Sequence, residues 1–256
     1  MSYRVEYAAI CFTGKERVNN EDNFYVDGRF LPEKNSGLPG LIEGTFLSGD
    51  RAMAAVFDGL GGCEAGERAA FLAAKTMGTL LNSKAEKEVA EADTHSLINS
   101  MCEELNRAVC GSQANATPLS RGTTVVSALF RNGKVAAWNV GDSMSFLIRE
   151  GRIKSVSKQH VADYGFVFGK PPITQCLGIP VDEMVIEPYI SEFPAREGDI
   201  ILLTSDGVTD VLSEEEILTL VERGETLGET TKKIASVVKL RGAPDNTTAV
   251  LCRVQI

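Results

Sequence analysis

The stretch Ala54-Ala55-Val56-Phe57-Asp58-Gly59 ends an apolar run on an Asp-Gly pair. A second run, from Ile200 to Ser205, ends in the same way on Asp206-Gly207, and Asp245 opens the last apolar run of the chain. Runs of this length predict buried strands, so each acid is expected at the end of a strand. Carboxylates gathered at one place repel one another, and their oxygens suit the hard cations Mg²⁺ and Mn²⁺. The pattern therefore favours hydrolytic chemistry on metal ions.

The composition sets limits on the class of protein. With 256 residues, 43% of them hydrophobic, the chain can bury a large core, and we expect one domain over residues 1–256. The net charge of −9 and the absence of a Lys/Arg block argue against a nucleic-acid partner. The six cysteines are scattered and contain no Cys-x-x-Cys pair, as in reduced cytosolic proteins. The chain has no signal-peptide pattern and no membrane-spanning run, so we expect a cytoplasmic protein that does not bind membranes. We also expect a monomer.

The periodicity of apolar residues divides the chain into groups of strands and pairs of helices. Apolar residues at spacings of three and four predict two amphipathic helices in the first half and two more near the C-terminus. Ser213 and Glu216 fit a capping box at the start of one of them. Asn132-Gly133 and Glu150-Gly151 predict hairpins in an antiparallel meander over residues 122–157. The predicted strands are 3–12, 24–27, 52–57, 199–204 and 247–254, and the predicted helices are 64–81, 95–113, 213–223 and 226–239. This order predicts an α+β layered domain.

Six ordered elements carry a resemblance to a known family. They are Arg17 to Asp22, Asp58 to Gly62, Gly122 to Thr124, Gly141 to Ser143, Ser205 to Gly207 and Pro244 to Thr247. In this order they resemble the metal-dependent Ser/Thr protein phosphatases of the protein phosphatase 2C type (PPM), and bacterial members in particular. The resemblance implies a four-layer α-β-β-α sandwich, in which two antiparallel sheets are flanked by helix pairs and metals lie at one edge of the sheets.

The resemblance also assigns roles to the acids. It implies that Asp58 bridges two Mn²⁺ or Mg²⁺ ions, that the carbonyl of Gly59 ligates one of them, and that Asp206 and Asp245 ligate the other. Asp142 would bind a third, weaker ion together with Asp206. The alternative for each acid is a turn residue whose side chain bonds to its own backbone.

Other residues match positions around the metals. Glu21 and Asp22 match an acidic pair that holds metal-bound waters, with a solvated charge pair as the alternative. Arg17 matches the family's phosphate-binding arginine, whose planar fork can make two hydrogen bonds to phosphate, with a surface ion pair as the alternative. Thr123 and Thr124 are expected to support the site. His160 is a candidate for substrate contact, with a structural role as its alternative.

Two departures from the family pattern affect the chemistry. Leu60 stands where animal members carry a histidine that protonates the leaving group, so this proton must come from water or another residue. A flap-like segment at about 158–188 is shorter than the mobile flap that bacterial members carry there, and Gln159 replaces the usual Asp before His160.

The function implied is hydrolysis of phosphoserine and phosphothreonine esters in proteins, in opposition to a Ser/Thr kinase. A water that bridges two metals attacks phosphorus directly, while Arg17 offsets charge on the phosphate oxygens. Two alternatives stay open. One is a catalytically silent module of the same fold that binds or senses a phosphoprotein, and the other is a phosphatase for small phosphate esters.

Overall fold

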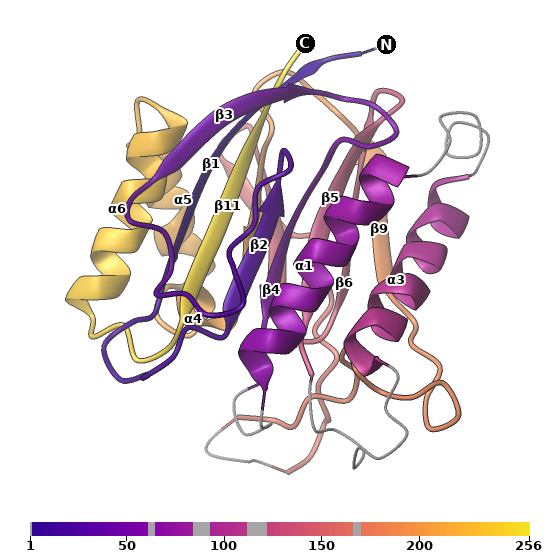
Figure 1. Ribbon diagram of the computed structural model, residues 1–256. Helices are drawn as coiled ribbons and strands as arrows, with labels where there is room; N and C mark the ends of the chain where they lie inside the picture. The colour runs from indigo at the N-terminus through magenta and orange to yellow at the C-terminus, as the bar shows by residue number, and fades with distance from the viewer. Residues whose placement is uncertain (1, 61–64, 84–92, 112–121, 166–169) are drawn as a thin grey trace.

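Two antiparallel sheets form the centre of the molecule (Figure 1). The structure is a computed structural model that describes residues 2–60, 65–83, 93–111, 122–165 and 170–256. One sheet contains, in spatial order, β3 (Ile42–Leu47), β1 (Arg4–Phe12), β11 (Thr247–Gln255), β10 (Ile200–Thr204), β7 (Met144–Arg149) and β8 (Arg152–Ser155). The other contains β2 (Asp22–Val26), β4 (Met53–Asp58), β5 (Val125–Arg131), β6 (Lys134–Val140) and β9 (Tyr189–Pro194).

The sheets and helices stack in four layers, as the resemblance implies. Helices α1 (Gly66–Ser83) and α3 (Thr94–Cys110) pack on the five-stranded sheet, and α5 (Glu214–Glu222) and α6 (Leu227–Leu240) pack on the other. Because side chains alternate along a strand, each central strand serves two cores. In β11, for example, Val250 and Cys252 lie between the two sheets, whereas Leu251 packs under the C-terminal helices. The predicted α-β-β-α sandwich is confirmed.

The turns that the sequence predicts are present. Asn132 and Gly133 have φ of 52° and 72°, and Glu150 and Gly151 have φ of 51° and 71°, so both pairs adopt the left-handed conformation of tight hairpins. Helix α3 ends at Cys110, earlier than predicted, because Gly111 takes a φ of 63° and its N–H bonds back to the carbonyl of Arg107. The predicted end at Gln113 lies outside the described residues. Glu64, the predicted start of the helix observed as α1, lies outside them too, as does Gly61-Gly62.

Among the described residues, three elements were not predicted. Strands β3 and β9 are edge strands with partly exposed side chains, so neither shows a continuous apolar run. Helix α4 (Asp206–Thr209) is a single turn, which is too short to show a periodicity. Within the described ranges, no helix is both long and apolar enough to cross a bilayer. The five cysteines in these ranges are free thiols.

The capping box predicted at the start of α5 is present. Ser213 Oγ accepts a hydrogen bond from the Glu216 N–H, and the Glu216 carboxylate accepts one from the Ser213 N–H. Ser213→Ala should lower the free energy of unfolding by about 1 kcal/mol, because the first turn loses an acceptor for an otherwise unpaired N–H. The midpoint of urea unfolding measures this change.

Thr219→Ala is the matched control in the same helix. The Thr219 hydroxyl donates to the carbonyl of Glu215, which belongs to its own helix, and caps no free N–H. Its removal should leave the midpoint unchanged or slightly higher. Equal midpoints for Ser213→Ala and the wild type would contradict a stabilising role of the capping box.

Candidate active site

One pocket at the ends of the central strands collects most of the predicted site residues. Its volume is about 620 Å³. Seven of the residues singled out in the sequence line it, namely Arg17, Glu21, Asp58, Gly59, Asp142, Asp206 and Asp245. Leu60 also lines it, and a wall is formed by residues 170–176 of the flap-like segment. Asp22 and His160 are not part of its lining.

Close backbone packing brings Asp206 beside Asp245. In the pairing of β10 with β11, Thr204 lies opposite Ala249, so the chain that leaves β10 passes the residues that lead into β11. At Gly207 a side chain is impossible, because an added Cβ would lie 2.0 Å from the carbonyl oxygen of Asn246. The glycine after the second Asp therefore sets how closely the two acids approach.

The glycine after the first Asp has a comparable role. The N–H of Gly59 donates to the carbonyl of Glu21 at 3.1 Å, and an added Cβ would lie 2.6 Å from that oxygen. The carbonyl of Asp58 accepts hydrogen bonds from the Thr123 hydroxyl at 2.9 Å and from the Thr124 N–H at 2.8 Å. Thr123 and Thr124 thus hold the end of β4, in agreement with the supporting role expected for them.

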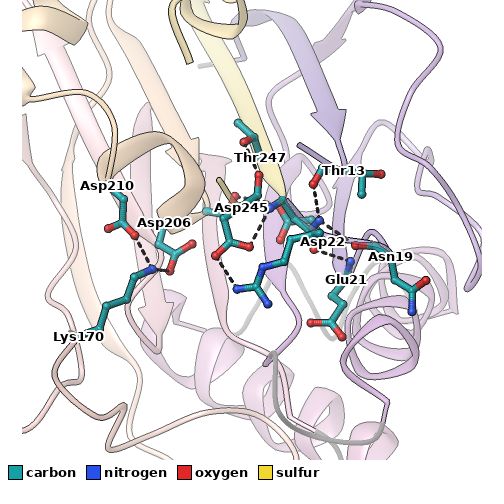
Figure 2. A network of polar contacts seen from close by, with 12 residues as sticks. Thr13, Asn19, Glu21, Asp22, Lys170, Asp206, Asp210, Asp245 and Thr247 are labelled. Atoms are coloured by element: carbon teal, nitrogen blue, oxygen red, sulfur yellow. Dashed lines mark hydrogen bonds and ion pairs between the residues drawn. The ribbon is translucent and has the colours of Figure 1, made fainter. Parts of the chain in front are cut away.

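Asn246 fastens the loop between β1 and β2, a function that the sequence analysis missed. Its side-chain amide donates to the carbonyls of Thr13 at 2.7 Å and Asn19 at 2.9 Å, and its Oδ1 accepts from the N–H of Glu21 at 2.8 Å. Figure 2 shows these bonds beside Asp245. The loop that carries Arg17 is therefore held against the start of β11. Sequence position alone gives no sign of these contacts, because the partners are more than 220 residues apart.

Burial and mutual repulsion act on the carboxylates of the pocket. The pKa of Asp58 is raised well above its ordinary value, first by burial and then by the negative charges of Asp206 and Asp22. Burial and the charge of Asp206 raise the pKa of Asp142 to about 6. Burial also raises the pKa of Asp206. Such a group of acids attracts cations.

Asp22 lies behind the pocket and is 1% exposed. It stands opposite Asp58 in the pairing of β2 with β4. Its Oδ2 accepts hydrogen bonds from the hydroxyls of Ser205 at 2.8 Å and Thr248 at 2.7 Å, so it connects the two sheets. Burial raises its pKa to about 7. Its Oδ1 is buried without a hydrogen-bond partner among the described residues, which is consistent with a place for ordered water.

Two basic side chains contact the acids. Arg17 Nη2 lies 2.8 Å from Asp245 Oδ2. Lys170 Nζ lies 2.5 Å from Asp206 Oδ2 and also contacts the carboxylate of Asp210 (Figure 2). Hydrogen bonding to Asp245 is the main reason that the pKa of Arg17 is raised. Neither Lys170 nor Asp210 was expected at the site. The only sign of Asp210 in the sequence is its position four residues after Asp206, which places both acids on one side of a helical turn.

His160 supports the turn that carries Asp142. Its side-chain Nδ1 accepts a hydrogen bond from the backbone N–H of Gly141 at 3.1 Å, and its backbone N–H donates to the Gly141 carbonyl at 2.9 Å. Burial, followed by the charge of Lys158, lowers its pKa. These contacts correspond to the structural alternative for His160.

The donor chemistry of the pocket fits hard divalent ions. Asp58, Asp206 and Asp245 offer carboxylate oxygens, and Mg²⁺ in proteins characteristically keeps several waters and takes few direct protein ligands. Among the described residues, no three His, Cys, Asp or Glu side chains converge as a closed metal cage. In this structure two of these carboxylates, Asp206 and Asp245, contact Lys170 and Arg17.

Comparisons with known proteins agree with this geometry. The family model described as "Protein phosphatase 2C" matches residues 44–239. The serine/threonine protein phosphatase PstP of Mycobacterium tuberculosis is 26% identical over 98% of this chain, which spans only 45% of PstP. The serine/threonine phosphatase stp of Listeria monocytogenes is 25% identical over 93% of this chain and 91% of stp.

A solved structure of the PstP catalytic domain in complex with two manganese ions superposes with a TM-score of 0.74, at 26% identity, over 99% of this chain and 100% of that one. The match to the family model covers more than half of the chain, and the fold agrees over nearly its whole length. The chain belongs to the protein phosphatase 2C family.

Proposed function

We propose that this protein is a metal-dependent phosphatase of phosphoserine and phosphothreonine in proteins. One observation carries the proposal: Asp58, Asp206 and Asp245, which lie far apart in the sequence, line one pocket together with the guanidinium of Arg17. Oxygen ligands for divalent ions and a two-pronged donor for phosphate are thus side by side. The metal-bound structure of PstP and the names of the relatives support the same reaction.

In this proposal two divalent ions, bound by Asp58, the Gly59 carbonyl, Asp206 and Asp245, would lower the pKa of a bridging water and supply counter-charge to the phosphate. Glu21, which lines the pocket, and Asp22, which lies behind it, would hold ordered waters. Arg17 would exchange its contact with Asp245 for phosphate oxygens of the substrate. Leu60 lines the pocket and has no proton to give, so the leaving alkoxide takes its proton from water or another residue.

The relatives support the proposed substrate class. PstP and stp are named as serine/threonine phosphatases, and we assign the same kind of phosphoprotein substrate to this chain. The chain is proposed to act as one catalytic domain, since β1 and β11 from its two ends pair along their whole lengths. An opposing Ser/Thr kinase, a monomeric state and a cytoplasmic location stay predictions.

Metal removal tests the reaction. The purified protein should release phosphate from p-nitrophenyl phosphate in the presence of Mn²⁺ and stop when EDTA is added, because water without a metal has too high a pKa to attack at neutral pH. Adding back excess Mn²⁺ should restore the rate. Full activity in a metal-stripped sample would rule out the two-metal reaction.

The same assay separates the alternatives. A silent phosphoprotein-binding module would bind phosphopeptides without turnover. A phosphatase for small esters would hydrolyse p-nitrophenyl phosphate and leave phosphoserine and phosphothreonine peptides intact.

Arg17 provides the second test. A charge-assisted contact of about 1.5–3 kcal/mol corresponds to roughly 10- to 150-fold in kcat/KM. Arg17→Ala should therefore lower kcat/KM by this factor, mainly through KM, and Arg17→Lys should lie between, because it keeps the charge but loses the planar fork. Steady-state kinetics with a phosphothreonine peptide measures the change.

Arg196→Ala is the matched control. Arg196 forms an exposed ion pair with Glu150 at 3.5 Å and does not line the pocket. Its loss should leave kcat/KM within about twofold of wild type, as expected for a surface pair. If Arg17→Ala behaves like this control while metal binding is retained, Arg17 does not contact the substrate.

A further inference from the structure

Lys170, in the flap-like segment, places a positive charge at the pocket. No lysine or arginine of this segment was expected there. Its ammonium lies between the carboxylates of Asp206 and Asp210, as Figure 2 shows, and the distance to Asp206 Oδ2 is 2.5 Å. Asp142 lines the same pocket. Asp142, Asp206 and Lys170 therefore share the pocket, and Asp210 adjoins it through its contact with Lys170.

The segment around Lys170 is built to hold it there. Val161 and Ile173 form an isolated bridge, and the N–H of Ala162 donates to the Pro172 carbonyl at 2.9 Å. The N–H of Thr174 donates to the carbonyl of His160 at 2.8 Å. Pro171 and Pro172 restrict the backbone directly after Lys170. The residues that follow Lys170 are thus held against residues 160–162.

The charge of Lys170 matters because the acids that it faces are partly buried. The side chains of Asp206 and Asp210 are 18% and 40% exposed, and that of Lys170 is 45% exposed. Burial alone would lower the pKa of Lys170, yet its pKa is raised, because the charges of Asp206 and Asp210 outweigh burial. Lys170 and Asp210 are both well exposed, and an ion pair of this kind contributes little to stability. Beside the less exposed carboxylate of Asp206, the ammonium supplies a counter-charge.

We propose that the ammonium of Lys170 takes the place of a third divalent ion at Asp142, Asp206 and Asp210. The protein then holds two metal ions, and the third cation of the site is the ammonium of its own Lys170. An ammonium suits this role because it is a compact point charge with three donors. Because Lys170 contacts Oδ2 of Asp206, Oδ1 remains able to ligate a metal. This inference rests on the proposed two-metal function.

The test counts bound Mn²⁺ by equilibrium dialysis of the full chain and does not depend on activity. Wild type should bind two ions per chain up to millimolar free Mn²⁺. Lys170→Gln should bind a third, weaker ion, because three acids are left without a counter-charge. Lys170→Arg, which keeps the charge, should bind two. Circular dichroism checks that each variant is folded.

Two further variants locate the effect. Lys134→Gln is the matched control, since Lys134 forms a comparable ion pair with Glu192 at 2.6 Å on an edge of the other sheet, and it should bind two ions. Lys170→Gln combined with Asp210→Asn should lose the third ion again. A third ion that persists in the double variant would contradict the assignment to Asp210.

The outcomes separate this inference from the proposed function. A wild-type protein that binds no Mn²⁺ would overturn the proposed function and this inference with it. Two ions in both wild type and a folded Lys170→Gln, or three ions in wild type, would overturn the role of Lys170 alone.

Discussion

Repulsion among carboxylates at one end of the two sheets is the constraint on which the rest of the site depends. Asp58, Asp142 and Asp206 are partly removed from water and face one another, and burial together with the neighbouring charges raises the pKa of each. A chain that brings these groups together opposes their ionisation and must be held by other interactions. The packing of the sheets and helices supplies these stabilising interactions, and cations at the pocket reduce the repulsion between the carboxylates. Cations bound at the pocket would therefore also stabilise the folded protein.

The two ends of the chain meet to make this possible. β1 and β11 pair over their full lengths, so the loop after β1 and the turn before β11 lie together. Asn246 then fixes that loop through three backbone groups. Since Arg17 is in this loop, its position relative to Asp245 depends on the sandwich being closed. A site assembled in this way has no counterpart in any one segment of the chain.

The two cations at the pocket have different chemistry. Arg17 offers a planar fork on a loop held by Asn246, which suits the geometry of phosphate. Lys170 offers a point charge on a loop stiffened by two prolines, which suits a cluster of acids. They contact Asp245 and Asp206 respectively, so the acids on the two sides of the pocket are neutralised by different parts of the chain. In this arrangement Lys170 can neutralise the acids while Arg17 is available to bind the phosphate of a substrate.

The buried strands and their terminal acids can be predicted from local patterns, namely apolar runs such as Ile200–Thr204 and the Asp-Gly pairs after them. The hairpin turns and the cap at Ser213 can be predicted as well, because they depend on neighbouring residues only. The edge strands β3 and β9 become visible in the folded sheets alone, because their exposed faces leave no apolar run. The contacts of Lys170, Asn246 and His160 likewise depend on the fold, because they join segments whose separation in sequence carries no periodic signal. A pattern along the chain reports burial, whereas a contact between distant side chains is fixed by how the layers pack.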